Sequence, residues 1–386
     1  MFRISSPVTR RAGTLAVALL MLTAAGCADD DSCCRIEGPQ PDPGSQASYT
    51  GQGPYPVGVI TLQLVDRKVD VLYPAVPGSE AGVARDTYRQ TDPLTDPLIK
   101  GFAEGIARRE GINLVYETRT FRGLPASSAG PFPVLLFSHG FGGWRSINSS
   151  LAAGIASWGF VVASADYLER GLNAVATNSA NPSPAKDLMV TNDTLALLRA
   201  QDADPESVLN GLMDFDHVGV AGHSAGGRTA LDALAETDID VAIGYAAAGG
   251  GSNGGKPVML IAARNDIGIT TAITEELYAT LSSPKRVIFV EQTGHNTFSD
   301  SCTAIRDGAS LAQLARQAGL QIDERLLALA ENGCAAEDLA PEDAQSIAQH
   351  FTVAQLRAAF GIDDPAVGLG TGVADEFLVP VEYRQE

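Results

Sequence analysis

The stretch that decides the fold is "HVGVAGHSAGGRTA", residues 217–230. An apolar run ends at Gly222, turns at Ser224 and continues as small residues that begin a predicted helix. The pattern Gly-x-Ser-x-Gly between a strand and a helix is typical of a nucleophile on a tight turn, where glycines remove Cβ atoms that would collide. The sequence therefore predicts that Ser224 is a nucleophile, with the amide of Ala225 directed at developing negative charge.

A second stretch fits the same pattern, which makes the pattern alone a weak signal. Ser252 lies in Gly250-Gly251-Ser252-Asn253-Gly254, after another apolar run. The residues that follow are "GKP" and a further apolar run, so no helix begins there. Because a nucleophile elbow needs strand, turn and helix in that order, the context favours Ser224 over Ser252.

The rest of the chain alternates apolar runs with helical patterns. Alternation of this kind predicts an α/β fold, in which a mostly parallel central sheet has helices on both faces. The runs are apolar throughout, as expected for strands that are covered on both sides. The clearest are "FPVLLFSHG" (132–140), "FVVASADY" (160–167), "VAIGYAAAGG" (241–250), "PVMLIAARND" (257–266) and "RVIFVEQTGH" (286–295).

A serine nucleophile needs a base and an acid, which follow it in this fold in the order Ser, acid, His. Of the five histidines, only His295 comes late and directly after a predicted strand. Asp266 ends the strand before it and is the predicted acid. Glu291 is the reserve acid, whereas Asp166 precedes Ser224 and breaks the order. The second oxyanion donor is expected in the glycine-rich loop after "FPVLLFSHG", where we select the amide of Phe141.

These segments, in this order, resemble the α/β-hydrolases of the group that contains platelet-activating-factor acetylhydrolases and bacterial cutinase-like polyester hydrolases. The resembling motifs span about Val57 to Phe360 and include "RKVDVLYPA", "FPVLLFSHGFGG", "VAGHSAGG" and "GHNTFSDSC". The resemblance implies the α/β-hydrolase fold. It also implies nucleophile, acid and base roles for Ser224, Asp266 and His295, and oxyanion binding by the amides of Phe141 and Ala225.

One segment departs from the polyester hydrolases of that group. They carry a tryptophan-bearing segment after the strand that follows the elbow helix, and it clamps aromatic substrates. Here the corresponding stretch, residues 246–257, reads "AAAGGGSNGGKP" and contains no aromatic residue. Activity on aromatic polyesters is therefore disfavoured. The related dienelactone hydrolases use Cys as nucleophile, so Ser224 also disfavours that group.

The N-terminus has the pattern of a targeting segment. Residues 1–11 carry arginines and no acid, and the apolar run 12–26 is too short to span a bilayer. The small residues before Cys27 resemble the lipobox of bacterial lipoproteins, which predicts a signal peptide over 1–26 and lipidation of Cys27. A plain secretory signal and a twin-arginine signal are the alternatives. Residues 27–56 are rich in Asp, Pro, Gly, Ser and Gln and predict a flexible tether.

The predicted hydrolase domain covers residues 57–386. Within it, an insertion near 79–130 contains one expected helix near 99–110, which could serve as a lid. From about residue 302 onward the chain is expected to be mostly helical.

Cysteine usage agrees with export to an oxidising compartment. If Cys27 is lipidated, four of the five cysteines remain, and they allow three pairings. We favour a disulfide between Cys302 and Cys334, because Cys33 and Cys34 are adjacent and lie in the tether. Two free thiols, or links from the tether to Cys302 and Cys334, are the alternatives.

Together these features predict an exported, lipid-anchored serine hydrolase that cleaves carboxylic esters through an acyl-enzyme. An acyltransferase with the same triad is one alternative, and a hydrolase-fold lipoprotein that only binds is another. The net charge of −19 argues against a nucleic-acid partner. No cofactor or metal is expected, because the sequence has neither His-Glu-x-x-His nor paired Cys/His clusters.

Overall fold

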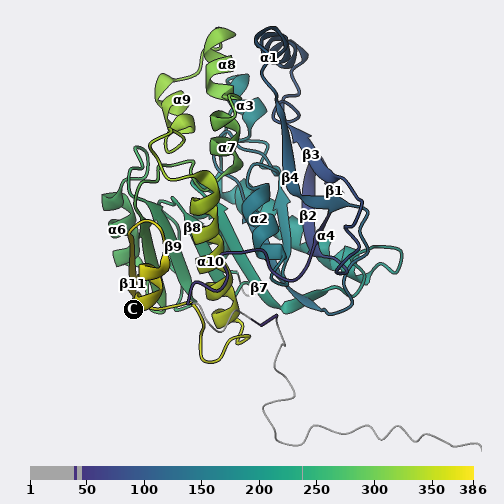
Figure 1. The fold of residues 1–386 in the computed structure, drawn as a ribbon, viewed down its shortest axis with the longest axis vertical. Coiled ribbons are helices and arrows are strands. Elements are labelled where there is room, and N and C mark those ends of the chain that lie inside the picture. Colours follow the sequence, from purple (N-terminus) through teal and green to yellow (C-terminus); the bar gives the residue numbers. More distant parts are fainter. Residues whose placement is uncertain (1–38, 41–45, 237) are drawn as a thin grey trace, which may run out of the picture. The chain divides into compact units, whose positions relative to one another are not determined.

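A mixed sheet of eleven strands runs through the part of the chain that the computed structural model describes, residues 39–40, 46–236 and 238–386 (Figure 1). The strands lie side by side in the order β11-β10-β9-β8-β7-β5-β6-β2-β1-β4-β3. Their bounds are β1 (Val57–Leu64), β2 (Arg67–Pro74), β3 (Arg85–Arg89), β4 (Val115–Arg122), β5 (Phe132–Ser138), β6 (Val161–Ala165), β7 (Met213–His223), β8 (Val241–Tyr245), β9 (Val258–Ala263), β10 (Lys285–Val290) and β11 (Val381–Gln385).

The six central strands are parallel, as the apolar runs predict. β5 pairs with β6 on one side and with β7 on the other, so Val134 lies between Val161 and Val218. β7, β8, β9 and β10 continue in the same direction. Every residue of β5, β6, β8 and β9 is buried, because helices cover both faces of the sheet. β1 and β2 form an antiparallel hairpin.

Two groups of helices pack against the sheet. α2 and α10 contact each other and lie in front of the sheet in Figure 1, whereas α4, α5 and α6 form the second group. The helices are α1 (Pro97–Glu110), α2 (Ser149–Ala156), α3 (Leu172–Ala176), α4 (Pro184–Ala203), α5 (Ala225–Ala233), α6 (Thr271–Thr280), α7 (Asp300–Arg306), α8 (Leu311–Gln317), α9 (Glu324–Glu331) and α10 (Pro341–Ala359), with a 3-10 helix η2 at Thr371–Glu376. The mostly parallel, doubly covered sheet is the expected fold class.

The segment near 79–130 is more than the helical insertion that the sequence suggested. It supplies β3 and β4, and β4 pairs with β1, so these strands extend the sheet. The sequence pattern does not reveal these two strands, because most of their residues are exposed or half-buried and many are charged. The expected helix is present as α1. Asp96 caps its first turn, and Gly111 ends it with a φ of 70°.

Residues 46–56 correct the prediction of a flexible tether over 27–56. Tyr49 is fully buried, its hydroxyl donates to the carboxylate of Asp363, and its amide donates to Nδ1 of His350. Its ring packs edge-on against Trp158. One large aromatic residue therefore fixes a segment whose polar, glycine-rich composition suggested mobility. Residues 1–38, with the predicted signal segment, Cys27, Cys33 and Cys34, lie outside the described residues.

The C-terminal part is helical from α7 to α10, as expected, but it ends in a strand. β11 pairs antiparallel with β10 and closes one edge of the sheet. Among the described residues, none of the helices has the length and apolar character needed to cross a membrane.

Candidate active site

Ser224 lies on a strained turn between β7 and α5. Its φ is 55°, a region that residues other than glycine rarely adopt. The turn is possible because the flanking positions lack side chains: a Cβ on Gly222 would overlap the carbonyl of Gly226, and one on Gly226 would overlap the carbonyl of Ser138. The Ser224 amide donates to the carbonyl of Tyr245 at 2.8 Å, which ties the turn to β8.

The structure brings Ser224, His295 and Asp266 together at the carboxyl ends of β7, β10 and β9. Nε2 of His295 lies 2.9 Å from the Ser224 hydroxyl, and Nδ1 of His295 lies 2.7 Å from Oδ2 of Asp266. A carboxylate can only accept, so Nδ1 carries the proton and Nε2 is left to accept the hydroxyl proton. This tautomer is the one that a general base next to a serine requires.

The Asp266 carboxylate is held by its own loop. Its Oδ1 accepts hydrogen bonds from the amides of Gly268 (2.7 Å) and Ile269 (2.8 Å), which leaves Oδ2 for His295. The Asp266 side chain is completely buried, and that of His295 is 4% exposed. The contact between Asp266 and His295 is therefore shielded from water. The carboxylate stabilises the positive charge that His295 gains on taking a proton more strongly here than it would at the surface.

The loop after β5 approaches Ser224 closely. A Cβ on Gly140 would come within 2.9 Å of Nδ1 of His223 and 3.2 Å of the Ser224 Cβ, so a larger residue there would displace the elbow. Within the described residues, the amides of Phe141 and Ala225 donate no hydrogen bond to another protein group. Two amides without a protein acceptor, one directly after Ser224 and one in the neighbouring loop, are what an oxyanion site needs.

Arg170 supports this loop, and nothing in the sequence pattern indicated it. Its guanidinium is fully buried, forms an ion pair with Asp187, and donates to the Ser138 hydroxyl (2.7 Å) and to the carbonyl of His139 (2.9 Å). The carbonyl of Arg170 accepts from the Gly142 amide at 2.7 Å. A buried arginine far from the elbow in sequence becomes identifiable only when the β5 and β6 loops are seen side by side.

Two further histidines belong to the scaffold of the site. Burial, followed by the charge of Arg170, lowers the pKa of His139 to about 3; its Nε2 accepts from the amide of Tyr167. Burial also lowers the pKa of His223 to about 3, and its Nε2 donates to the carbonyl of His295 at 2.8 Å. Both rings are therefore neutral structural groups, and His223 helps to fix the loop that carries His295.

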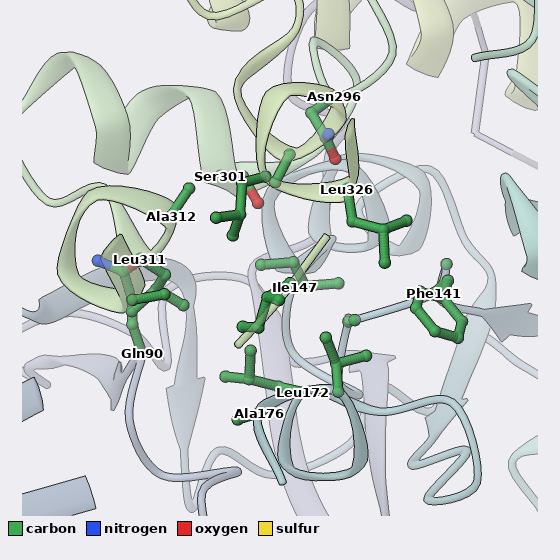
Figure 2. Close-up of a pocket in the computed structure, with 18 of the residues that line it drawn as sticks. Gln90, Phe141, Ile147, Leu172, Ala176, Asn296, Ser301, Leu311, Ala312 and Leu326 are labelled. Carbon is green, nitrogen blue, oxygen red and sulfur yellow. The ribbon is translucent and has the colours of Figure 1, made fainter. Parts of the chain in front are cut away.

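A pocket of about 200 Å³ opens at Ser224 and His295. Its walls come from α1, α3, α8 and α9, which lie at one end of the sheet, and are largely aliphatic (Figure 1). Figure 2 shows Leu172 of α3 facing Leu326 of α9, with Phe141 at one end of the pocket and Gln90 at the other. The pocket therefore accommodates an apolar group next to the hydroxyl.

The other candidates lie elsewhere. Ser252 is exposed in the loop between β8 and β9, and its hydroxyl accepts from the Gly254 amide. The carboxylate of Glu291 is bound by Arg264 at 2.8 Å, and that of Asp166 by Arg145 at 2.9 Å. Each is thus engaged outside the Ser224 cluster. Across residues 39–40, 46–236 and 238–386, no group of three or more His, Cys, Asp or Glu side chains is arranged to hold a metal ion.

Cys302 and Cys334 are joined by a disulfide, with their Cα atoms 4.6 Å apart. The bond connects α7, which follows the His295 loop, to the turn after α9. Both cysteines are buried. The loop that carries His295 is therefore covalently linked, through seven residues, to the helices that line the pocket.

A solved structure with the same architecture identifies the fold. The ferulic acid esterase of Streptomyces cinnamoneus matches with a TM-score of 0.58, covering 86% of this chain and 96% of its own, at 18% sequence identity. At that identity the likeness concerns the fold. The chain has the α/β-hydrolase fold, as the sequence motifs implied.

Within that fold, part of the chain resembles platelet-activating factor acetylhydrolases. The family described as "Platelet-activating factor acetylhydrolase, isoform II" matches residues 116–210, which include Phe141 and end before Ser224. The acetylhydrolases of Cavia porcellus and Canis lupus familiaris are each 26% identical, over 149 and 150 residues, or 29% of this chain. The chain spans 34% of the length of these relatives. The resemblance to this group is confirmed over that segment.

Proposed function

We propose that the protein is a serine hydrolase that cleaves carboxylic esters through an acyl-enzyme intermediate. The observation that carries the proposal is the position of His295, whose two ring nitrogens contact the Ser224 hydroxyl and the Asp266 carboxylate. The names of the matched relatives, acetylhydrolases and an esterase, support ester hydrolysis as the reaction class.

The reaction follows from the geometry. Nε2 of His295 takes the hydroxyl proton of Ser224 while Oγ bonds to the ester carbonyl carbon. The carbonyl oxygen becomes negative and is bound by the amides of Phe141 and Ala225. The protonated Nε2 then gives its proton to the leaving alcohol oxygen as the C–O bond breaks. Asp266 stabilises the imidazolium throughout.

The second half of the reaction repeats these steps with water. Nε2 of His295 removes a proton from a water molecule, whose oxygen bonds to the acyl carbon. The same amides bind the second oxyanion, and the proton returns from His295 to Oγ of Ser224 as the carboxylic acid leaves. Nε2 of His295 accepts and donates the proton at every step of both halves.

The pocket supports esters that carry an apolar group as substrates. Its walls are largely aliphatic and are formed by α1, α3, α8 and α9. Burial of apolar surface there contributes about 25 cal/mol per Å² of area removed from water, so binding should strengthen as aliphatic groups are added until the pocket is full.

A fluorophosphonate probe tests the proposal. The probe phosphonylates an activated serine, because Oγ bonds to phosphorus as fluoride leaves, and peptide mass spectrometry locates the modified residue. We expect a single labelled peptide that contains Ser224, and loss of nitrophenyl ester hydrolysis in proportion to labelling. An unlabelled protein, or hydrolysis that persists after complete labelling, would contradict the proposal.

We further propose that the protein is exported and anchored by a lipid on Cys27. The signal-like sequence of residues 1–26 supports this, as does the Cys302–Cys334 disulfide, because disulfides persist mainly in oxidising compartments. Cell fractionation tests it. Cys27→Ser should release the protein from the membrane fraction, and unchanged attachment in that variant would contradict the anchor.

A further inference from the structure

The side chain of Asn332, in the turn after α9, contacts the backbone beside both the acid and the base. Its Oδ1 accepts hydrogen bonds from the amides of His295 (2.8 Å) and Ile267 (3.2 Å). Its Nδ2 donates to the carbonyl of Asn265 at 3.2 Å. Because Asn265 and Ile267 flank Asp266, one carboxamide fixes the acid loop and the base loop relative to each other.

Asn332 is itself held in place by its own backbone. Its carbonyl accepts from the amide of Asn296 at 3.0 Å, directly after His295. The next residue, Gly333, packs so closely on Gly294 that a Cβ on Gly294 would overlap the Gly333 amide. Cys334 then forms the disulfide to Cys302. The turn 332–334 is thus attached to the His295 loop by hydrogen bonds, close packing and a covalent bond.

The same turn is the end of a pocket wall. Leu326, Leu327 and Leu329 of α9 line the pocket, and Leu329 lies only one turn of helix before Asn332. The Leu329 carbonyl accepts from the amide of Asn332 and from Nδ2 of Asn296. A group that fills the pocket therefore contacts the helix whose end determines where Asn332 lies.

We propose that Asn332 is a positioning residue that sets the distance between Asp266 and His295, and that it couples this distance to α9. The inference rests on the proposed function, in which these two residues act on Ser224. Displacements of about 1 Å in an active site can cost about a hundred-fold in rate. Loss of the carboxamide removes its hydrogen bonds to both loops at once. We therefore expect a large decrease in kcat and only a small change in KM.

Asn332→Ala tests the inference, and Asn253→Ala is the matched control. Asn332 is half-buried and Asn253 is buried, and Asn253 likewise bridges two loops, donating to the carbonyls of Lys256 and Ser282 and accepting from the Ser282 amide. It does so next to the N-terminal ends of β9 and β10, opposite the carboxyl ends that carry the site. Both variants should lose stability, but only Asn332→Ala should lose kcat, by about ten- to a hundred-fold with KM within about threefold.

Asn332→Asp gives a second readout, which reports whether residue 332 lies close enough to His295 to act on its proton. The carboxylate keeps acceptors for the two amides but adds a negative charge beside the imidazole, which favours its protonated form. The acid limb of kcat/KM against pH should therefore move to higher pH. Asn253→Asp should leave the pH profile unchanged.

The outcomes separate this inference from the proposed function. If Ser224→Ala keeps wild-type activity, the proposed function fails. If Ser224→Ala is inactive while Asn332→Ala keeps kcat within twofold of wild type and Asn332→Asp leaves the pH profile unmoved, the positioning role is overturned and the proposed function stands. Each enzyme is assayed well below its melting temperature, so that unfolding does not lower kcat.

Discussion

Nε2 of His295 lies 2.9 Å from the hydroxyl of Ser224, although 71 positions separate the two residues in the chain. The parallel sheet creates this contact, because β7 and β10 run in the same direction and end at the same edge. The strained φ of Ser224 raises its hydroxyl toward that edge. The loop that brings His295 back to it is held by two hydrogen bonds: Nε2 of His223 donates to the His295 carbonyl, and the His295 amide donates to Oδ1 of Asn332.

The close packing of the elbow predicts the effect of a single methyl group. In Gly226→Ala the new Cβ overlaps the Ser138 carbonyl, so β5 and the elbow must separate. Overpacking typically costs about 1–3 kcal/mol, and the displaced elbow should also lose activity. Urea unfolding and ester hydrolysis measure the two effects. The control is Gly101→Ala on α1, where no other atom lies within 4 Å of the new Cβ; its free energy of unfolding should stay equal or rise by up to about 1 kcal/mol.

Buried histidines predict that stability falls in mild acid. Burial lowers the pKa of His139 and His223 to about 3 and that of His350 to about 4, against about 6.5 in an unfolded chain. Below pH ~6.5 the unfolded state therefore binds protons that the folded state does not. Each such histidine lowers the free energy of unfolding by up to about 1.4 kcal/mol per pH unit. Asp300 has the opposite effect below pH ~6. Burial raises its pKa to about 6, so the folded state binds a proton there that the unfolded state does not, and this offsets the loss from one histidine.

The variant His350→Asn measures the contribution of one histidine to this pH dependence. His350 lies in α10, away from Ser224, and bonds to the Tyr49 amide and the Gly368 carbonyl. The variant should be less stable at neutral pH, where the hydrogen bonds of His350 are lost without compensation, but the dependence of its unfolding free energy on pH between 6 and 5 should be shallower by about 1.4 kcal/mol per unit at most. Equal slopes for wild type and variant would mean that His350 is not kept neutral by the fold.

The disulfide should support stability and activity together. Closing the 32-residue segment between Cys302 and Cys334 contributes about 3 to 4 kcal/mol in the chain-entropy estimate. The Cys302→Ser, Cys334→Ser double variant should lose about that much unfolding free energy and also kcat, because the Asn332 turn is freed. Replacing Cys33 and Cys34 by Ser should change neither quantity. A double variant with lower stability but wild-type kcat would show that the disulfide does not hold the His295 loop.

Narrowing the pocket should alter the preference for ester size. Ala176 of α3 lines the pocket and is half-buried, so a larger side chain can be placed there without opening the core. Ala176→Phe should lower kcat/KM for nitrophenyl esters of long acyl chains and leave the acetyl ester within about twofold. A uniform decrease for all chain lengths would argue against this wall as the acyl site.

The sequence predicted the parts of the fold that depend on local pattern. Apolar runs marked the parallel strands, and the Gly-x-Ser-x-Gly context separated Ser224 from Ser252. The strands β3 and β4 at one end of the sheet and β11 at the other were not predicted, because strands with many exposed or charged residues lack the apolar signal of a buried strand. The order of elements selected Asp266 and His295, and the structure brings both together with Ser224, since parallel strands end at one edge.

The residues that support the site could be identified only from the structure. Arg170, His223 and Asn332 act through contacts that join loops distant in the chain, and no local pattern marks such contacts. The tether prediction failed at 46–56 for the same reason. Composition described the segment correctly as polar, but the contacts of Tyr49 with α10 and its following loop decide its structure.

The most direct test of the account is kcat/KM for a nitrophenyl ester in Ser224→Ala and in Ser252→Ala, measured on folded protein beside the wild type. The account predicts a decrease of about a million-fold in Ser224→Ala, as for other triad knockouts, and a value within twofold of wild type in Ser252→Ala. Wild-type activity in Ser224→Ala, with or without a loss in Ser252→Ala, would contradict it.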